Sequence, residues 1–146
     1  MNSTAVTAAL MTMLAWGGAA VCDKFGMRGL SSPLMGVMVR LTVAFAGFWV
    51  VFLIRGDWRE LRTIPTQNLL PLALGGILGA FLGQLAYFTA IKNADASRVV
   101  PFTASYPIVA LVLAAILLRE PITLMKVLGT MMILGGLMLV SGAAGK

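Results

Sequence analysis

The stretch 69–91 reads LLPLALGGILGAFLGQLAYFTAI and contains no charged residue. A transmembrane α-helix needs about 20 consecutive, mostly apolar residues. This stretch is long enough, and its unbroken apolar character predicts a helix that crosses a bilayer. Four further mostly apolar stretches lie at 4–22, 33–54, 99–118 and 123–141, with one charge in each of the second and the last, Arg40 and Lys126. The sequence therefore predicts an all-α membrane protein with five transmembrane helices, which form a single domain over residues 1–146.

The composition of the whole chain points the same way. Of its 146 residues, 60% are hydrophobic and 11% are charged, whereas soluble domains carry about 45–50% apolar and 25% charged residues. Because a short chain leaves much of its surface exposed, lipid is the expected solvent for the surplus apolar side chains. Nearly all charges fall in the short gaps between the apolar stretches. Consecutive helices are then expected to be antiparallel neighbours.

Arg40 lies inside the apolar stretch 33–54, a short distance after Pro33. A charge at the bilayer centre costs about 2.5–3.5 kcal/mol, but Arg40 lies only roughly 10 Å along a helix from Pro33. We expect its side chain to snorkel to the interface and anchor the helix there. The alternative is that Arg40 gates the protein or binds an anionic substrate.

The titratable residues exclude several kinds of site. The chain has no histidine, so a zinc site and a His-based catalytic triad are not expected. No acid is expected deep in a helix, which disfavours a proton carrier at the middle of the membrane. The five acids are Asp23, Asp57, Glu60, Asp95 and Glu120. We expect no metal ion, no cofactor and no enzymatic activity; a lipid-acting membrane enzyme is disfavoured because no nucleophile–base pair is present.

The eleven basic residues lie singly between apolar runs rather than in a stripe. They are expected to face lipid headgroups, and no nucleic-acid partner is expected. With five helices, one side of the membrane receives Arg55, Arg59, Arg62, Arg119 and Lys126. The other side receives Lys24, Arg28, Lys92, Arg98 and Lys146, with Arg40 leaning to it. This near balance gives little orienting bias. It suggests either insertion in both orientations with pairing as an antiparallel dimer, or one orientation chosen by folding or by a partner.

Several short patterns occur in a characteristic order along the chain. They are Trp16-Gly17 and then Lys24, Ser32-Pro33 and then Arg40, Tyr106-Pro107, Leu118-Arg119-Glu120, Ile122-Thr123, Gly129 and Gly135-Gly136. In this order the chain resembles one repeat of the drug/metabolite transporter superfamily, an EamA-type domain, over essentially its whole length. The resemblance implies a small-molecule transporter, an exporter of metabolites, amino acids or drug-like compounds, in the bacterial inner membrane.

Members of that family typically carry two such five-helix repeats in inverted orientation, whereas this sequence contains one. Inverted repeats build a substrate site at their interface. The resemblance therefore implies that the chain pairs with an oppositely oriented copy of itself. The alternative is a five-helix subunit that pairs with a related half in a heteromeric transporter.

Some polar and aromatic residues in the apolar stretches are candidates for solute contact. Gln84 and Tyr87 share one helix face with Phe88. Thr103 and Tyr106 flank Pro107, which is expected to kink the fourth helix, since interrupted helices often mark transporter sites. The alternative is a structural kink whose small polar residues bond to their own backbone.

The remaining candidates are less specific. Trp16 either lines a cavity or packs. In the family, helices corresponding to the first, third and fourth tend to line the central cavity, which favours the candidates Trp16, Gln84, Tyr87, Thr103 and Tyr106. Glu120 beside Arg119 is either an interfacial ion pair or a gate. Gly75, Gly79 and Gly83 recur every four residues, a spacing that favours close helix packing over substrate contact.

Overall fold

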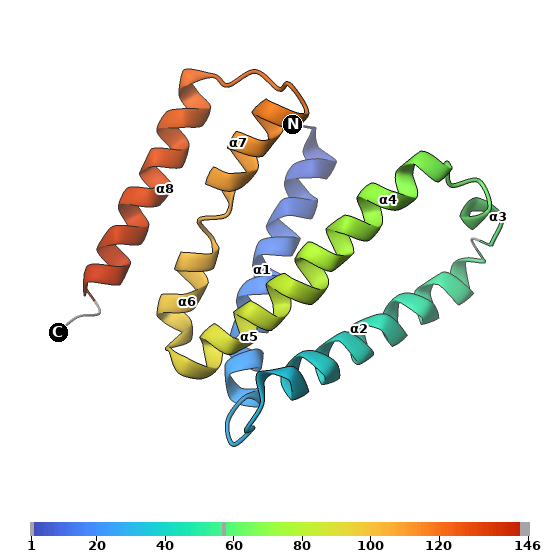
Figure 1. Ribbon diagram of the computed structural model, residues 1–146, viewed down its shortest axis with the longest axis horizontal. Helices are drawn as coiled ribbons and strands as arrows, with labels where there is room; N and C mark the ends of the chain where they lie inside the picture. Colours follow the sequence, from blue (N-terminus) through green and yellow to red (C-terminus); the bar gives the residue numbers. More distant parts are fainter. Residues whose placement is uncertain (1, 57, 144–146) are drawn as a thin grey trace. The chain divides into compact units, whose positions relative to one another are not determined.

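The computed structural model describes residues 2–56 and 58–143. Within these residues every regular element is a helix (Figure 1), which confirms the predicted all-α membrane fold. In this part of the chain, four helices are long and apolar enough to cross a bilayer: Ser3–Gly26, Pro33–Arg55, Thr66–Asn93 and Ala96–Leu117. A fifth apolar helix, Leu124–Val140, is shorter. Asp57 and Lys146 lie outside the described residues, as does the side chain of Arg59.

The helices divide into two compact units, residues 1–93 and residues 94–146. The first unit holds α1 (Ser3–Gly26), α2 (Pro33–Arg55), α3 (Trp58–Leu61), α4 (Thr66–Gly75), the π-helix η1 (Gly76–Gly83) and α5 (Gln84–Asn93). The second holds α6 (Ala96–Thr103), α7 (Pro107–Leu117) and α8 (Leu124–Ala143).

The first two helices begin and end at residues suited to those positions. The side chain of Asn2 accepts a hydrogen bond of 3.0 Å from the Ala5 N–H and so caps α1. Pro33 opens α2, where its fixed φ suits the first turn. Gly56 ends α2 in the left-handed conformation with φ at 69°, which glycine adopts without steric cost. α1 continues to Gly26, beyond the predicted end at residue 22.

The third membrane-spanning segment contains a π-helix between two α-helices. Wider π-helical turns bring the Leu78 carbonyl toward Gly83, where an added Cβ would lie 2.9 Å from its oxygen. Glycine at that position therefore lets the π-helix close. At Gly75 and Gly79 an added Cβ would meet no atom within 4 Å. Within the described residues, the close helix packing expected on these glycines is not observed.

The core of the first unit lies at one end of its helices. Its buried apolar residues are Ala20, Met27, Val37, Phe88 and Ile91. They belong to the last turns of α1 and the turn after it, the first turns of α2, and α5, which packs against both α1 and α2. Along α4 and η1 no described residue is buried. Most apolar side chains outside this core are exposed, as expected for helices that lie in lipid.

Aromatic side chains gather at the far end of α2. The Trp49 ring packs edge-on against Phe45 and Phe52, with centroids 6.0 and 5.6 Å away. Trp58 of α3 joins them, with its ring centroid 4.7 Å from that of Phe52. Tryptophan concentrates at membrane–water interfaces, so this cluster marks one interface for α2.

The second unit contains an interrupted membrane-spanning helix. The sequence predicts one helix over 99–118, but α6 ends at Thr103 and α7 begins at Pro107. The chain then turns at Arg119, which has a positive φ of 53°. α8 follows and packs against α6.

Candidate functional site

Arg40 is the centre of a polar cluster in the first unit. Its Nη1 lies 2.7 Å from Oδ2 of Asp23 in an ion pair. The same nitrogen donates a hydrogen bond of 3.2 Å to Oε1 of Gln84. These three residues come from α2, α1 and α5, so a single guanidinium joins three helices.

The ion pair between Asp23 and Arg40 is partly buried. The Asp23 side chain is 11% exposed and that of Arg40 is 31% exposed. Both residues lie within membrane-spanning helices, where an unpaired charge is costly and pairing reduces the cost. Arg40 therefore has an acidic partner near the end of α1, and its expected position at the membrane interface stays a prediction. Asp23 was expected in a loop, but α1 extends past it and places its carboxylate beside Arg40.

Two aromatic rings lie beside the guanidinium. The Arg40 Cζ is 5.8 Å from the centroid of the Phe88 ring, within the range of a cation–π interaction. Tyr87 packs edge-on against Phe88 with centroids 5.9 Å apart. Two of the predicted candidates, Gln84 and Tyr87, thus belong to the same cluster as Arg40, and Gln84 has the polar partner that its position requires.

Two lysines close the same end of the first unit. Nζ of Lys24 donates a hydrogen bond of 2.8 Å to the carbonyl of Ile91 near the end of α5. Nζ of Lys92 donates to the carbonyl of Ser31 in the turn before α2. Carbonyls at a helix C-terminus have no partner within the helix, and lysines commonly satisfy them. Lys24 therefore satisfies a carbonyl near the end of α5, and both lysines join segments that are far apart in sequence.

At the break between α6 and α7, nearby backbone and side-chain groups hydrogen-bond to one another. Because proline has no N–H, Pro107 cannot donate to the Thr103 carbonyl; instead the Tyr106 N–H donates to it over 3.2 Å. The Thr103 hydroxyl donates to the Val100 carbonyl and the Ser105 hydroxyl to the Phe102 carbonyl. The small polar side chains around the break thus bond to their own backbone.

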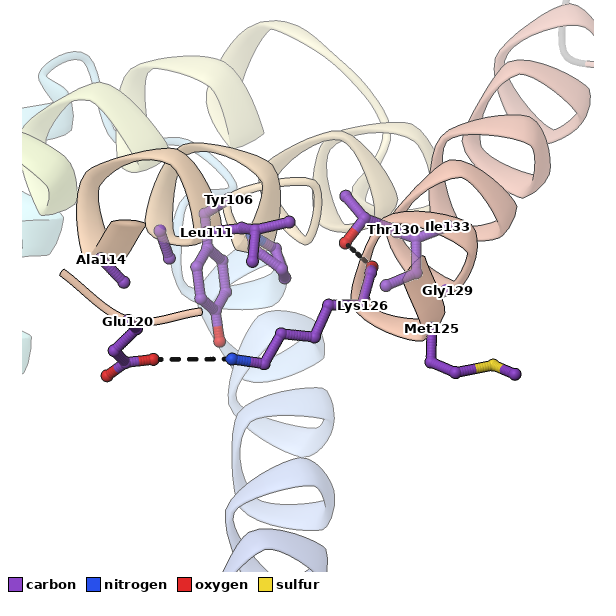
Figure 2. A pocket seen from close by; sticks show the side chains of 11 residues that line it. Tyr106, Leu111, Ala114, Glu120, Met125, Lys126, Gly129, Thr130 and Ile133 are labelled. Atoms are coloured by element: carbon purple, nitrogen blue, oxygen red, sulfur yellow. Dashed lines mark hydrogen bonds and ion pairs between the residues drawn. The ribbon is translucent and has the colours of Figure 1, made fainter. Parts of the chain in front are cut away.

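A groove beside this break is the second cluster (Figure 2). Its volume is about 630 Å³, and its lining includes Tyr106, Pro107, Glu120, Lys126 and Thr130. The rest of the wall is apolar and comes from α7 and α8: Ala110, Leu111, Ala114, Met125, Gly129 and Ile133. Aromatic, charged and apolar groups therefore share one concave surface.

Lys126 provides the charge at the mouth of this groove. Its Nζ lies 3.7 Å from Oε2 of Glu120 and donates a hydrogen bond of 3.1 Å to the Pro121 carbonyl. Figure 2 shows the two charged side chains pointing toward each other, beside the Tyr106 ring. Both are about half exposed, so the pair is accessible to water and to a solute. The Thr130 hydroxyl donates a hydrogen bond of 2.8 Å to the Lys126 carbonyl.

Two predicted candidates belong to neither cluster. Trp16 lies on α1 with 62% of its surface exposed. Thr103 is exposed and its hydroxyl bonds within α6. The clusters also contain Asp23, Lys126 and Thr130, which sequence reasoning did not select. The signal for Asp23 was present: an arginine inside an apolar stretch calls for a nearby acid, and Asp23 directly follows the first such stretch.

Comparisons with known proteins bear on this arrangement. The model of the EamA-like transporter family matches residues 3–142. A curated relative from Sinorhizobium sp, described as an uncharacterized transporter in the cobO 3' region, is 31% identical over 110 residues, which cover 75% of this chain and 77% of the relative. No solved structure matches the chain significantly. The chain therefore belongs to the EamA-like transporter family and is a multi-pass membrane transporter.

Proposed function

We propose that the protein exports small molecules, such as metabolites, amino acids or drug-like compounds, as an antiparallel homodimer in the bacterial inner membrane. The observation that carries the proposal is the near balance of basic residues between the two sides of the membrane. Lysine and arginine in short loops normally fix orientation. A chain with almost no bias can insert both ways and so supply both halves of an inverted pair.

The length of the relative supports the same assembly. The matched region covers similar shares of both chains, so the relative is of almost the same length as this one. Transporter sites commonly lie between two inverted repeats. A five-helix unit supplies one repeat, and an oppositely oriented copy supplies the other.

The groove in the second unit supports a small solute as cargo. The groove is open rather than enclosed, and its volume of about 630 Å³ is in the range of small-molecule sites, roughly 300–1,000 Å³. The apolar wall and the Tyr106 ring suit the body of a solute, and Lys126 with Glu120 suits a polar end. The proposed solute contacts are Trp16, Gln84, Tyr87, Thr103 and Tyr106, together with the groove pair Glu120 and Lys126.

Orientation is the first test. Cys22, the only cysteine, is replaced by serine, and a new cysteine is placed at Gly145. Intact cells are then treated with a membrane-impermeant thiol reagent. We expect about half of the protein to react, with the rest reacting after lysis, because both orientations coexist. Labelling near zero or near complete would contradict the homodimer; co-purification of a second five-helix protein would then identify a heteromeric transporter.

Transport is the second test. Proteoliposomes containing the purified protein are given a panel of radiolabelled amino acids, small organic acids and the dye ethidium. We expect at least one compound to cross faster than in empty liposomes. Lys126→Gln is expected to change the apparent affinity for that compound, whereas Arg62→Gln, which removes an exposed cation in the turn before α4, serves as the control. Equal leakage from both kinds of liposome for every compound would overturn the proposal.

A further inference from the structure

The first unit is packed at one end only. Its five buried residues and its inter-helix ion pair lie together where α1, α2 and α5 meet. Gly36 lets α2 approach so closely that an added Cβ would lie 2.5 Å from Sδ of Met27 and 2.7 Å from the Phe88 ring. Figure 1 shows the turn between α1 and α2 at this end, with α4 leading away from it.

The contacts at this end join three helices through very few groups. Nη1 of Arg40 holds both the Asp23 carboxylate and the Gln84 side-chain oxygen. Phe88 lies beneath the guanidinium and against Gly36. Lys24 also joins α1 to α5 through the Ile91 carbonyl, so a polar contact links each pair of the three helices.

These contacts are also of a kind that separates and re-forms. Arg40 is 31% exposed, so water or lipid headgroups can satisfy the separated groups when the pair opens. Opening of the polar cluster would also separate the close contact between Gly36 and the buried Phe88 ring.

We infer that Asp23, Arg40 and Gln84, with the Gly36–Phe88 contact beneath them, form a gate that closes one end of the first unit. This inference rests on the proposed antiparallel transporter. In such a dimer, two copies of the gate face opposite sides of the membrane. The same residues then close the pathway toward either side, and transport requires the two copies to open alternately.

A reversible lock tests the gate. In a Cys22→Ser background, Gly36→Cys and Phe88→Cys place two thiols across the contact, and the smaller side chain at position 88 makes room for the new one. Oxidation, or a short bifunctional thiol reagent, joins them. In proteoliposomes with the compound panel above, we expect transport to cease on cross-linking and to return with reductant. Each single-cysteine variant is expected to transport at the same rate before and after the same treatment.

The outcomes separate the gate from the proposed function. If the Cys22→Ser protein, which keeps Gly36 and Phe88, moves no compound, the proposed function fails. If the cross-linked protein moves its compound at the reduced rate, the function stands and the gate is wrong. The contact would then be static packing.

Accessibility provides a readout that needs no transport. Ile91 is fully buried at this end, and a cysteine there in the Cys22→Ser background is expected to react slowly with a small impermeant thiol reagent. Adding Asp23→Asn is expected to speed labelling by about tenfold, while adding Asp95→Asn, an acid before α6, leaves it unchanged. Equal labelling with both additions would overturn the gate.

Discussion

Gly36 of α2 and Phe88 of α5 approach so closely that even a methyl group between them would lie 2.7 Å from two ring carbons. Phe88 is 2% exposed, and the Met27 sulfur lies on the other side of the same space. The ring therefore has little freedom to withdraw. The absence of a side chain at position 36 sets how near the two helices can come.

Gly36→Ala is expected to destabilise the protein by about 1–3 kcal/mol, the usual cost of overpacking. The measurement is thermal unfolding in detergent. Gly47→Ala on the same helix is the control, since an added Cβ there meets nothing within 4 Å. It is expected to be neutral or stabilising by up to about 1 kcal/mol, because alanine favours helix. Equal effects of the two substitutions would contradict the close approach.

The two ion pairs are expected to differ sharply in strength. Asp23→Asn leaves Arg40 without its counter-ion within a membrane span and should cost about 2 kcal/mol, below the 3–5 kcal/mol of a fully buried pair because Arg40 is partly exposed. Glu120→Gln breaks a half-exposed pair with groups 3.7 Å apart and should change stability by less than about 0.5 kcal/mol.

Unfolding of both variants, with and without added salt, measures this difference. Salt is expected to have little effect on the contribution of the Asp23–Arg40 pair and to screen the Glu120–Lys126 pair. A double-mutant cycle with Asp23→Ala and Arg40→Ala should show a coupling above about 0.5 kcal/mol. A cycle that closes without coupling would show that the two side chains act independently.

Pro107→Ala is expected to rejoin α6 and α7. Alanine restores an N–H that can donate to the Thr103 carbonyl, now bonded to Tyr106. The Tyr106 ring would then leave its place in the groove. We expect transport to fall by about tenfold, equivalent to about 1.4 kcal/mol in the barrier, without loss of thermal stability. Undiminished transport would show that the break is purely structural.

Arg119 has a left-handed backbone that L side chains rarely adopt. Arg119→Gly is expected to relieve that strain, and Arg119→Val to increase it, because a branched side chain is least tolerated there. The glycine variant should therefore be more stable than the valine variant by at least about 1 kcal/mol. Chemical unfolding of the pair measures the difference. Equal stabilities would mean that the turn readily adopts another conformation.

The sequence was sufficient for the fold class because each apolar stretch is a long local signal. The family resemblance, which rested on short patterns spread along the chain, is confirmed by the family match. The predicted helix ends were less accurate where charged residues were assigned to a loop, as at the end of α1. Asp23 and Lys24 are tolerated in the last turns of α1 because their partners, Arg40 and the Ile91 carbonyl, lie on other helices.

The candidate site was predictable only in part. Gln84 and Tyr87 were found because they share a helix face, and that face meets Arg40. The groove was not found as a unit because its walls come from two helices, α7 and α8, whose pairing depends on the turn at Arg119. The π-helix was also missed, since its hydrogen bonding differs from that of an α-helix while its composition does not.

The membrane-spanning helices of this one chain differ greatly in length. The segment Thr66–Asn93 has 28 residues, about 42 Å if fully α-helical, whereas the 20 residues of α8 span about 30 Å. A bilayer core of about 30 Å accommodates the second upright and the first only by tilting or bending. A change in membrane thickness is therefore expected to change the tilt of the long segment more than that of α8.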